Sequence, residues 1–263
     1  MENSLLSVPG PYVSVRCYLQ IADVGLRMRA APNTQAEILR KIPCSAPVFV
    51  LREENGWAYG CCGGYLGWMS LEYLRPIEGG RAQLIVPNFL PEEMQLQFIR
   101  AISLFDAYSS DAVDIGFPGP TQPISVDDRF SGRADQLYPT KAALRTALES
   151  LFTQECIQRD FILEDPSLLS EVNGALYVSC GGRGSWEANI TGYKLNRHSD
   201  DEIAMEAQFH FGTAQDWTCT LPIDLVRTPA GWRFSQFTTQ RNDSRWIAAM
   251  GDGFDVWAAC GKV

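Results

Sequence analysis

Residues 12–76 combine short apolar stretches with closely spaced turn signals, and this pattern limits most strongly what the chain can form. The clearest signal is Asn55-Gly56, because both residues accept the positive backbone φ angles that a two-residue hairpin requires. A second turn is expected at 62–65. Strand candidates without a helical period surround these turns, at 13–17, 25–29, 46–51, 57–61 and 66–69. Short strands at this spacing predict a small all-β barrel.

Residues 25–74 contain an ordered series of motifs. The series is a Gly-Leu-x-x-Arg strand, a Pro-containing loop, a hydrophobic strand, Asn-Gly-Trp, Gly-Trp and a terminal Tyr-Leu. The residues in it are Gly25, Leu26, Arg29, Pro32, Ile38, Leu39, Asn55, Gly56, Trp57, Gly67, Trp68, Tyr73 and Leu74. With this series, residues 25–74 resemble a bacterial SH3 domain. Cys44-Ser45 departs from the family, which usually turns here on Lys-Gly or a similar pair. The resemblance implies an SH3-like barrel that binds cell-wall peptides, with peptidoglycan stem peptides as partners.

Flat aromatic side chains with a few hydrogen-bond donors suit the recognition of short peptides. The candidate peptide-binding residues are Tyr18, Arg27, Trp57, Tyr59, Tyr65 and Trp68. An alternative interpretation places Trp57 and Trp68 in the core or against turns. Basic residues outnumber acidic ones within 12–76, whereas the whole chain carries a net charge of −9. Anionic wall polymers would therefore favour this part of the chain.

The remaining chain is expected to hold a linker at 77–90, an α+β domain at 91–245 and a C-terminal tail at 246–263. Helices come first: one follows Pro91 and others lie near 138–152 and after Thr153, which can cap its helix. After these helices, apolar residues recur at every second position, which is typical of β-strands. The later strand candidates are 175–180, 189–195, 203–211, 217–225 and 231–237. Helices packed on a curled antiparallel sheet give a cone of the cystatin-like or nuclear-transport-factor-like kind.

The later part of the chain contains a Leu-x-x-Leu-Phe helix, Asn-Gly-Ala-Leu-Tyr-Val, a Gly-Arg-Gly turn and Gly-Trp-Arg-Phe. With these motifs it resembles the DL-endopeptidase autolysin-inhibitor family of Gram-positive bacteria. This resemblance implies a domain that inhibits a cell-wall endopeptidase by inserting loops at its active site. The candidate partner-binding residues are Arg129, Phe130 and Arg133 in an irregular excursion, and Arg183 and Trp186 in the Gly-rich turn. Alternatively these are ordinary loop residues, with Trp186 capping the open end of the cone.

An enzyme is the weaker alternative. A cysteine peptidase of the NlpC type needs a Cys nucleophile and a His base, for which Cys156 and His210 are the candidates, but the usual Asp-Cys-Ser context is absent. Two histidines and eight cysteines without a C-x-x-C pair do not indicate a metal site, and no cofactor is expected. A third interpretation is a sensory domain that binds a small ligand in a cavity lined by Met205, Phe209 and Trp217.

Charge and hydropathy argue against nucleic-acid binding and against a membrane span. A chain with a pI of about 4.8 repels phosphate backbones, so nucleic acid is not an expected partner. No apolar run approaches the ~20 residues of a membrane span. The start at Met1 to Ser4 shows no signal peptide, so an extracellular or cell-wall location implies a leader already removed, and a cytoplasmic location is the alternative. Disulfides and buried free thiols both remain open for the eight cysteines.

Overall fold

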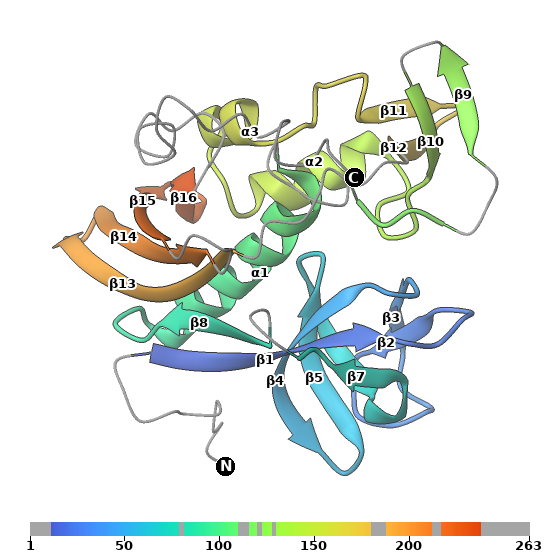
Figure 1. Ribbon diagram of the computed structural model, residues 1–263, viewed down its shortest axis with the longest axis horizontal. Coiled ribbons are helices and arrows are strands. Elements are labelled where there is room, and N and C mark those ends of the chain that lie inside the picture. Colours follow the sequence, from blue (N-terminus) through green and yellow to red (C-terminus); the bar gives the residue numbers. More distant parts are fainter. Residues whose placement is uncertain are drawn as a thin grey trace.

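The computed structural model is described for residues 12–78, 82–109, 116–119, 123–127, 130–179, 188–211 and 217–237. Within these ranges the chain is mostly β, with three antiparallel sheets and three α-helices (Figure 1). One sheet has eight strands and the other two have four strands each.

The eight-stranded N-terminal sheet is SH3-like and contains the strands expected from the sequence. Its strands are β1 (Tyr12–Gln20), β2 (Leu26–Arg29), β3 (Ile38–Ile42), β4 (Pro47–Glu54), β5 (Trp57–Cys62), β6 (Tyr65–Ser70), β7 (Leu74–Pro76) and β8 (Gln83–Pro87). The order is β3-β2-β6-β5-β4-β1-β7, and β8 also pairs with β1. The predicted hairpin turn is confirmed, since Asn55 and Gly56 have φ angles of 48° and 80°.

Strand β1 is long enough to pair with two partners on one edge. Its Tyr18–Gln20 end pairs with β7, and its Tyr12–Arg16 part pairs with β8. Strand β8 therefore lies inside the segment expected as a linker. Its alternation covers only five residues between Gly and Pro signals, so the sequence pattern there resembled a junction.

Helix α1 (Glu92–Tyr108) lies between the N-terminal sheet and the other two sheets (Figure 1). The helical period predicts its buried face correctly, from Met94 to Tyr108. Helices α2 (Lys141–Glu149) and α3 (Gln154–Asp160) follow, and the Thr153 side chain caps α3 by accepting from the Cys156 amide, as expected. None of the described helices has the length and apolar character needed to cross a membrane.

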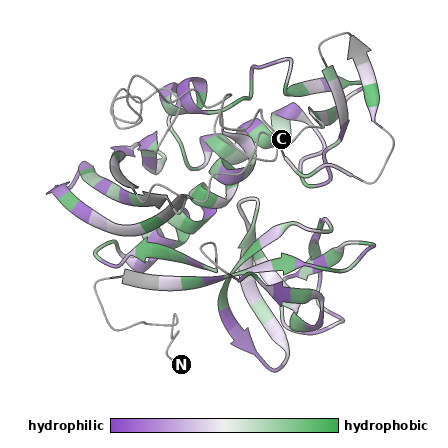
Figure 2. Cartoon of the chain, in the orientation of Figure 1, coloured by the Kyte–Doolittle hydropathy of each residue, from purple (hydrophilic) through white to green (hydrophobic). Residues whose placement is uncertain are grey.

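The later strands form two sheets where a single curled one was expected. The first contains β9 (Ile124–Asp127), β10 (Phe130–Ala134), β11 (Leu169–Val172) and β12 (Ala175–Ser179), in the order β11-β12-β10-β9. The second is the meander β13 (Ala188–His198), β14 (Glu202–Phe211), β15 (Trp217–Thr228) and β16 (Gly231–Phe237). Hydrophilic and hydrophobic residues alternate visibly along β13 and β14 (Figure 2). Alternation identifies the buried face of a strand and not its neighbour, so the sequence pattern does not separate β12 from the strands of the later meander.

One hydrophobic cluster connects these elements, from Val15 in the N-terminal sheet to Phe237 in β16. On α1, Phe98 and Phe105 contact Phe237 with ring centroids 5.8 and 5.1 Å apart. The separation of residues 12–76 from 91–245 stays a proposal, and the packed core is continuous across it.

Candidate functional site

A row of side chains crosses four strands of the N-terminal sheet. The strand register places Arg52 opposite Tyr59, Tyr59 opposite Trp68, and Trp68 opposite Arg29. Residues directly opposite each other point to the same face of a sheet. We call this the outer face. The inner face carries fully buried side chains, among them Val48, Val50, Ala58 and Met69.

Three of the predicted peptide-binding residues meet on the outer face. The Trp68 ring lies 5.3 Å from the Tyr59 ring, centroid to centroid, and the Arg52 guanidinium carbon lies 4.8 Å from the Trp68 centroid. Trp57, two residues before Tyr59, is half-buried on the same face and opposite Ser70. Arg52 and Tyr59 cover Trp68, which is only 7% exposed. The site therefore presents Trp57, Tyr59 and a cation–π pair.

Charges around Tyr59 come from two parts of the chain. Arg52 lies 3.1 Å from Glu54, in a pair whose side chains are 40% and 46% exposed, so this pair contributes little to stability. Burial raises the pKa of the Tyr59 phenol, while the charges of Arg52 and Arg100 oppose that rise.

Helix α1 bounds the outer face at one end. The next register pair beyond Tyr59 and Trp68 is Cys61 opposite Leu66. Cys61 is fully buried, and its thiol is hydrogen-bonded to Ser103 of α1. From the same helix, Arg100 Nε donates to the Gly64 carbonyl at 2.9 Å. The face is thus exposed near Trp57 and covered by α1 near Cys61.

Tyr18 is engaged in a separate cluster on β1. Its hydroxyl donates to Glu53 Oε1 at 2.6 Å, and Arg16 lies 5.3 Å from its ring centroid. The residue is only 4% exposed. Burial and the hydrogen bond to Glu53 raise its pKa to about 12. Tyr18 is therefore a buried, hydrogen-bonded residue of the sheet and does not belong to the row on the outer face.

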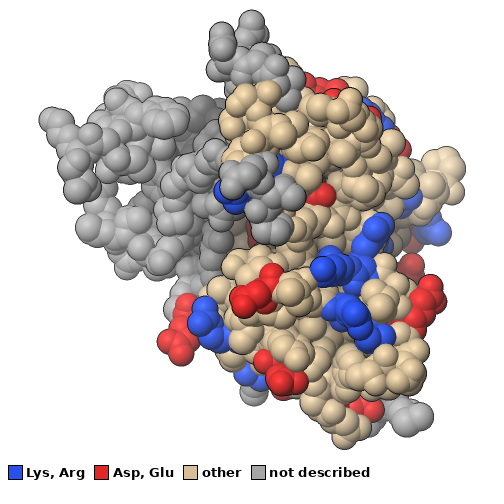
Figure 3. All heavy atoms as spheres, turned by 90° about the vertical axis from the view of Figure 1, so that its right-hand side faces the viewer, with Lys and Arg blue, Asp and Glu red and all other residues tan. Residues whose placement is uncertain are grey.

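Tyr65 lies at the start of β6, where strand alternation directs it away from the outer face. Its ring stacks on Tyr138 at 5.3 Å, and its hydroxyl accepts from Arg40 Nη2 at 2.6 Å. Arg27 is exposed on β2 opposite Lys41. Figure 3 shows the side of the molecule where β2 and β3 lie, and Lys and Arg side chains gather there. The six predicted residues therefore do not form a single cluster.

Sequence reasoning missed Arg52 and Arg100. Arg52 could have been found from the Asn55-Gly56 hairpin, because a two-residue turn pairs positions 54 with 57 and directs position 52 towards 59. No sequence signal places Arg100, which comes from a helix packed on the sheet.

The structure describes two of the five predicted partner-binding residues, Phe130 and Arg133. Phe130 is only 3% exposed and its ring lies over Gly132, so it is not available to a partner in this conformation. Arg133 is half-buried on β10, and its buried Nε has no hydrogen-bond partner in the described part of the chain. Arg129, Arg183 and Trp186 lie outside the described residues.

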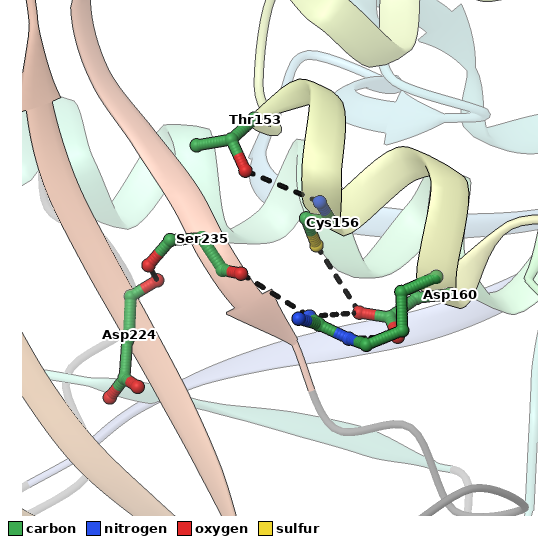
Figure 4. Close-up of polar contacts among 6 residues, drawn as sticks. Thr153, Cys156, Asp160, Asp224 and Ser235 are labelled. Atoms are coloured by element: carbon green, nitrogen blue, oxygen red, sulfur yellow. Dashed lines mark hydrogen bonds and ion pairs between the residues drawn. The ribbon is translucent and has the colours of Figure 1, made fainter.

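The Cys156 thiol is arranged as a hydrogen-bond donor (Figure 4). It donates to Asp160 Oδ2 at 3.3 Å, while Arg159 binds both carboxylate oxygens of Asp160 at 2.8 and 2.7 Å. Burial and the Asp160 carboxylate raise the pKa of this thiol far above neutral pH. A protonated, buried thiol is a poor nucleophile. The side chain of His210, its predicted base, lies outside the described residues.

The predicted ligand cavity residues Met205 and Phe209 are buried in the hydrophobic cluster, and the Trp217 side chain lies outside the described residues. In the described ranges, no group of three or more His, Cys, Asp and Glu side chains could hold a metal ion.

Comparison with known proteins identifies the N-terminal part. Residues 24–75 match the family model described as bacterial SH3 domain, and this range contains Arg52, Trp57, Tyr59 and Trp68. No curated protein and no solved structure matches the chain. These comparisons give no support to the autolysin-inhibitor resemblance of the later part. A domain of the matched kind indicates binding to the cell wall. Residues 24–75 are thus a bacterial SH3 domain.

Proposed function

We propose that the protein is a non-catalytic binding protein of the bacterial cell envelope, located in the cell wall or outside the cell. Its SH3 domain binds peptidoglycan stem peptides through the outer face. The observation that carries this proposal is the row of Arg52, Tyr59 and Trp68 with Trp57 beside it. Aromatic and Arg side chains dominate the energetics of peptide and protein interfaces.

The geometry of the row favours binding without much loss of side-chain freedom. Arg52 over Trp68 and the contact between Trp68 and Tyr59 hold these side chains before a ligand arrives. A preorganised surface loses less entropy on binding than a flexible one. Trp57 and Tyr59 are half-buried, so each retains exposed area for a ligand.

Co-sedimentation of the full chain with purified peptidoglycan sacculi tests this proposal. We expect Trp57→Ala and Tyr59→Ala each to weaken binding by about tenfold, a common loss at an interface hot spot. Tyr177→Ala is the matched control, because Tyr177 is a half-buried tyrosine on β12 of another sheet. Circular dichroism would confirm that the variants are folded. Wild-type binding by both outer-face variants would contradict the proposal.

For residues 91–245 we propose binding and inhibition of a peptidoglycan DL-endopeptidase. The motif resemblance supports this role. So does Arg133, a half-buried Arg on β10 whose Nε has no hydrogen-bond partner within the described ranges. A wall-bound SH3 domain sharing a core with this part would hold the inhibitor beside the substrate of its target.

Digestion of purified peptidoglycan by an NlpC-type endopeptidase, followed by turbidity, tests the inhibitor. We expect the protein to slow digestion and to have no activity alone. Arg133→Ala should relieve inhibition. The control Arg197→Ala should not, because Arg197 lies on β13 in an exposed ion pair with Glu202. Clearing by the protein alone would show a hydrolase. Undiminished digestion would contradict inhibition and leave wall binding or ligand sensing as the role of the chain.

A further inference from the structure

Arg27 lies on the outer face, on the same side of the sheet as Trp57. Strand β2 is antiparallel to β6, with Arg29 opposite Trp68. Side chains two residues apart on a strand point to the same face, so Arg27 shares the face of Arg29, and Ser70 shares the face of Trp68. Because the two strands are antiparallel, Arg27 lies at the Ser70 end of this pair.

A second row across the outer face therefore connects Trp57 with two basic residues. Trp57 on β5 is opposite Ser70 on β6, and Arg27 on β2 is opposite Lys41 on β3. Neighbouring strands lie about 4.8 Å apart, so two strand spacings, roughly 10 Å, separate Trp57 from Arg27. An extended peptide of about three residues spans that distance. The second row lies at the exposed end of the outer face, away from the end that α1 covers.

Contact with Gly25 also places the Lys41 side chain on this face. Gly25 comes two residues before Arg27 in the chain, so the two residues face the same side. A Cβ added at Gly25 would lie 2.9 Å from Lys41 Cε and 3.3 Å from Lys41 Cγ. The apolar stem of Lys41 therefore runs over Gly25, while the residue as a whole is exposed.

Arg27 and Lys41 carry positive charge that the described chain does not neutralise. Both residues are exposed, and neither side chain forms an ion pair or a hydrogen bond within the described ranges. The acids closest to them in sequence, Asp23 and Glu37, are not paired with them either. Like charges directly opposite each other on neighbouring strands are destabilising. An anionic group bound between the two side chains would remove this repulsion.

We infer that Arg27 and Lys41 bind a carboxylate of the peptide whose apolar part lies on Trp57. The inference rests on the proposed function, since it specifies which chemical group of the wall peptide the outer face recognises. Guanidinium and ammonium groups form charge-assisted hydrogen bonds with carboxylates. The other neighbour of Trp57 sets the orientation, because Glu54 lies opposite it on β4 and is paired with Arg52 at 3.1 Å. A ligand carboxylate is therefore attracted to the β2–β3 side of Trp57.

Fluorescence anisotropy with the full chain tests the inference. The probe is a peptidoglycan stem pentapeptide labelled at its N-terminus, prepared with all carboxyl groups free or with all of them converted to amides. We expect the acid form to bind about fivefold more tightly than the amide form, as for an ion pair at an exposed site. This preference should shrink in about 1 M salt, where charges are screened beyond about 3 Å.

Variants then locate the carboxylate. Arg27→Gln and Lys41→Gln should each lower the acid preference to about twofold, and the double variant should abolish it. Arg75→Gln is the matched control and should keep the preference, because Arg75 is an exposed Arg on β7 with no ion pair in the described part of the chain. Trp57→Ala should weaken both peptides by the same factor.

A stability measurement distinguishes ligand binding from a structural role. The two Gln variants should not lower the free energy of unfolding in urea denaturation, because each removes a repulsion between like charges. A loss of the acid preference that comes with a lower free energy of unfolding would assign Arg27 and Lys41 a structural role and overturn the inference.

Sacculus binding, measured on the same protein, separates the inference from the proposed function. Binding to sacculi with equal affinity for the two peptides overturns the inference and leaves the function standing. The same holds if neither peptide binds, if the double variant keeps the acid preference, or if Arg75→Gln removes it. An acid preference that depends on Arg27 and Lys41, without sacculus binding, supports the inference and overturns the function.

Discussion

The hydroxyl of Tyr138 donates a hydrogen bond of 2.6 Å to the backbone carbonyl of Gly63. This bond joins the segment before α2 to the β5–β6 turn of the SH3 domain. The Tyr138 amide in turn donates to Asp135 Oδ1 at 2.7 Å, and Asp135 Oδ2 accepts from the Tyr108 hydroxyl of α1 at 2.7 Å. The β5–β6 turn, near the part of the outer face that α1 covers, is therefore held by the later part of the chain.

Removing the Tyr138 hydroxyl should loosen this connection. Tyr138→Phe keeps the ring and its stacking on Tyr65 but leaves the buried Gly63 carbonyl without its donor. An unsatisfied buried group costs about 1–3 kcal/mol, so the free energy of unfolding should fall by that amount in urea denaturation. The control Tyr73→Phe removes a hydroxyl from a residue that is 40% exposed and should change little. Equal stability of both variants would contradict the connection.

A methyl group at Gly63 should disturb the same contact by crowding. Gly63 has a φ of 51°, and a Cβ there would collide with the Leu137 side chain and crowd the ring of Phe117. Gly174 is the matched control, because it has a φ of 77° and open space around an added Cβ.

Both substitutions to Ala should cost about 1–2 kcal/mol for the left-handed backbone. Gly63→Ala should cost about 1–3 kcal/mol more because of overpacking. Denaturation curves of the two variants give the difference directly. Equal losses at the two glycines would mean that the later part of the chain does not press on this turn.

Cysteine reactivity should follow burial. Cys44 is exposed, whereas Cys17, Cys61, Cys62 and Cys156 are buried. Burial and the neighbouring Asp160 carboxylate raise the pKa of Cys156, and burial raises that of Cys61 to about 11. At pH 8, iodoacetamide should therefore modify Cys44 rapidly and the buried four only after unfolding. Peptide mapping by mass spectrometry reads each site, and rapid modification of Cys156 in the folded protein would restore it as a candidate nucleophile.

Alkaline titration should show that the Tyr18 phenol ionises at a higher pH than an ordinary tyrosine. Its pKa is raised from 10.0 to about 12 by burial and by the hydrogen bond to Glu53, so the folded protein holds this proton more tightly than the unfolded chain. The resulting stabilisation is complete below pH 10.0 and is lost as the pH rises through about 12. Tyr18→Phe should remove one late-ionising phenol from the ultraviolet titration, and Glu53→Gln should lower the pKa of Tyr18. Ionisation of Tyr18 near its ordinary pKa would contradict the buried hydrogen bond.

Local features were determined by the sequence itself. The Asn55-Gly56 turn, the apolar face of α1 and the Thr153 cap depend on residues close together in the chain, whose backbone preferences act without a partner. The SH3 pattern was recognisable for the same reason, because its turns and strands follow each other directly. Trp57, Tyr59 and Trp68 could be placed on one face from strand alternation across the single β5–β6 hairpin.

Tertiary structure alone decided which residues became neighbours over long separations. Strand β8 joins β1, Tyr65 stacks on Tyr138, and Arg100 reaches the β5–β6 turn, across gaps that no local period encodes. The division of the later strands into two sheets has the same cause, since alternation marks a face and leaves the partner open. The hydrophobic effect favours the burial of apolar surface but has no preferred direction, so it does not by itself specify which segments pair. These contacts are therefore determined only when the whole chain packs.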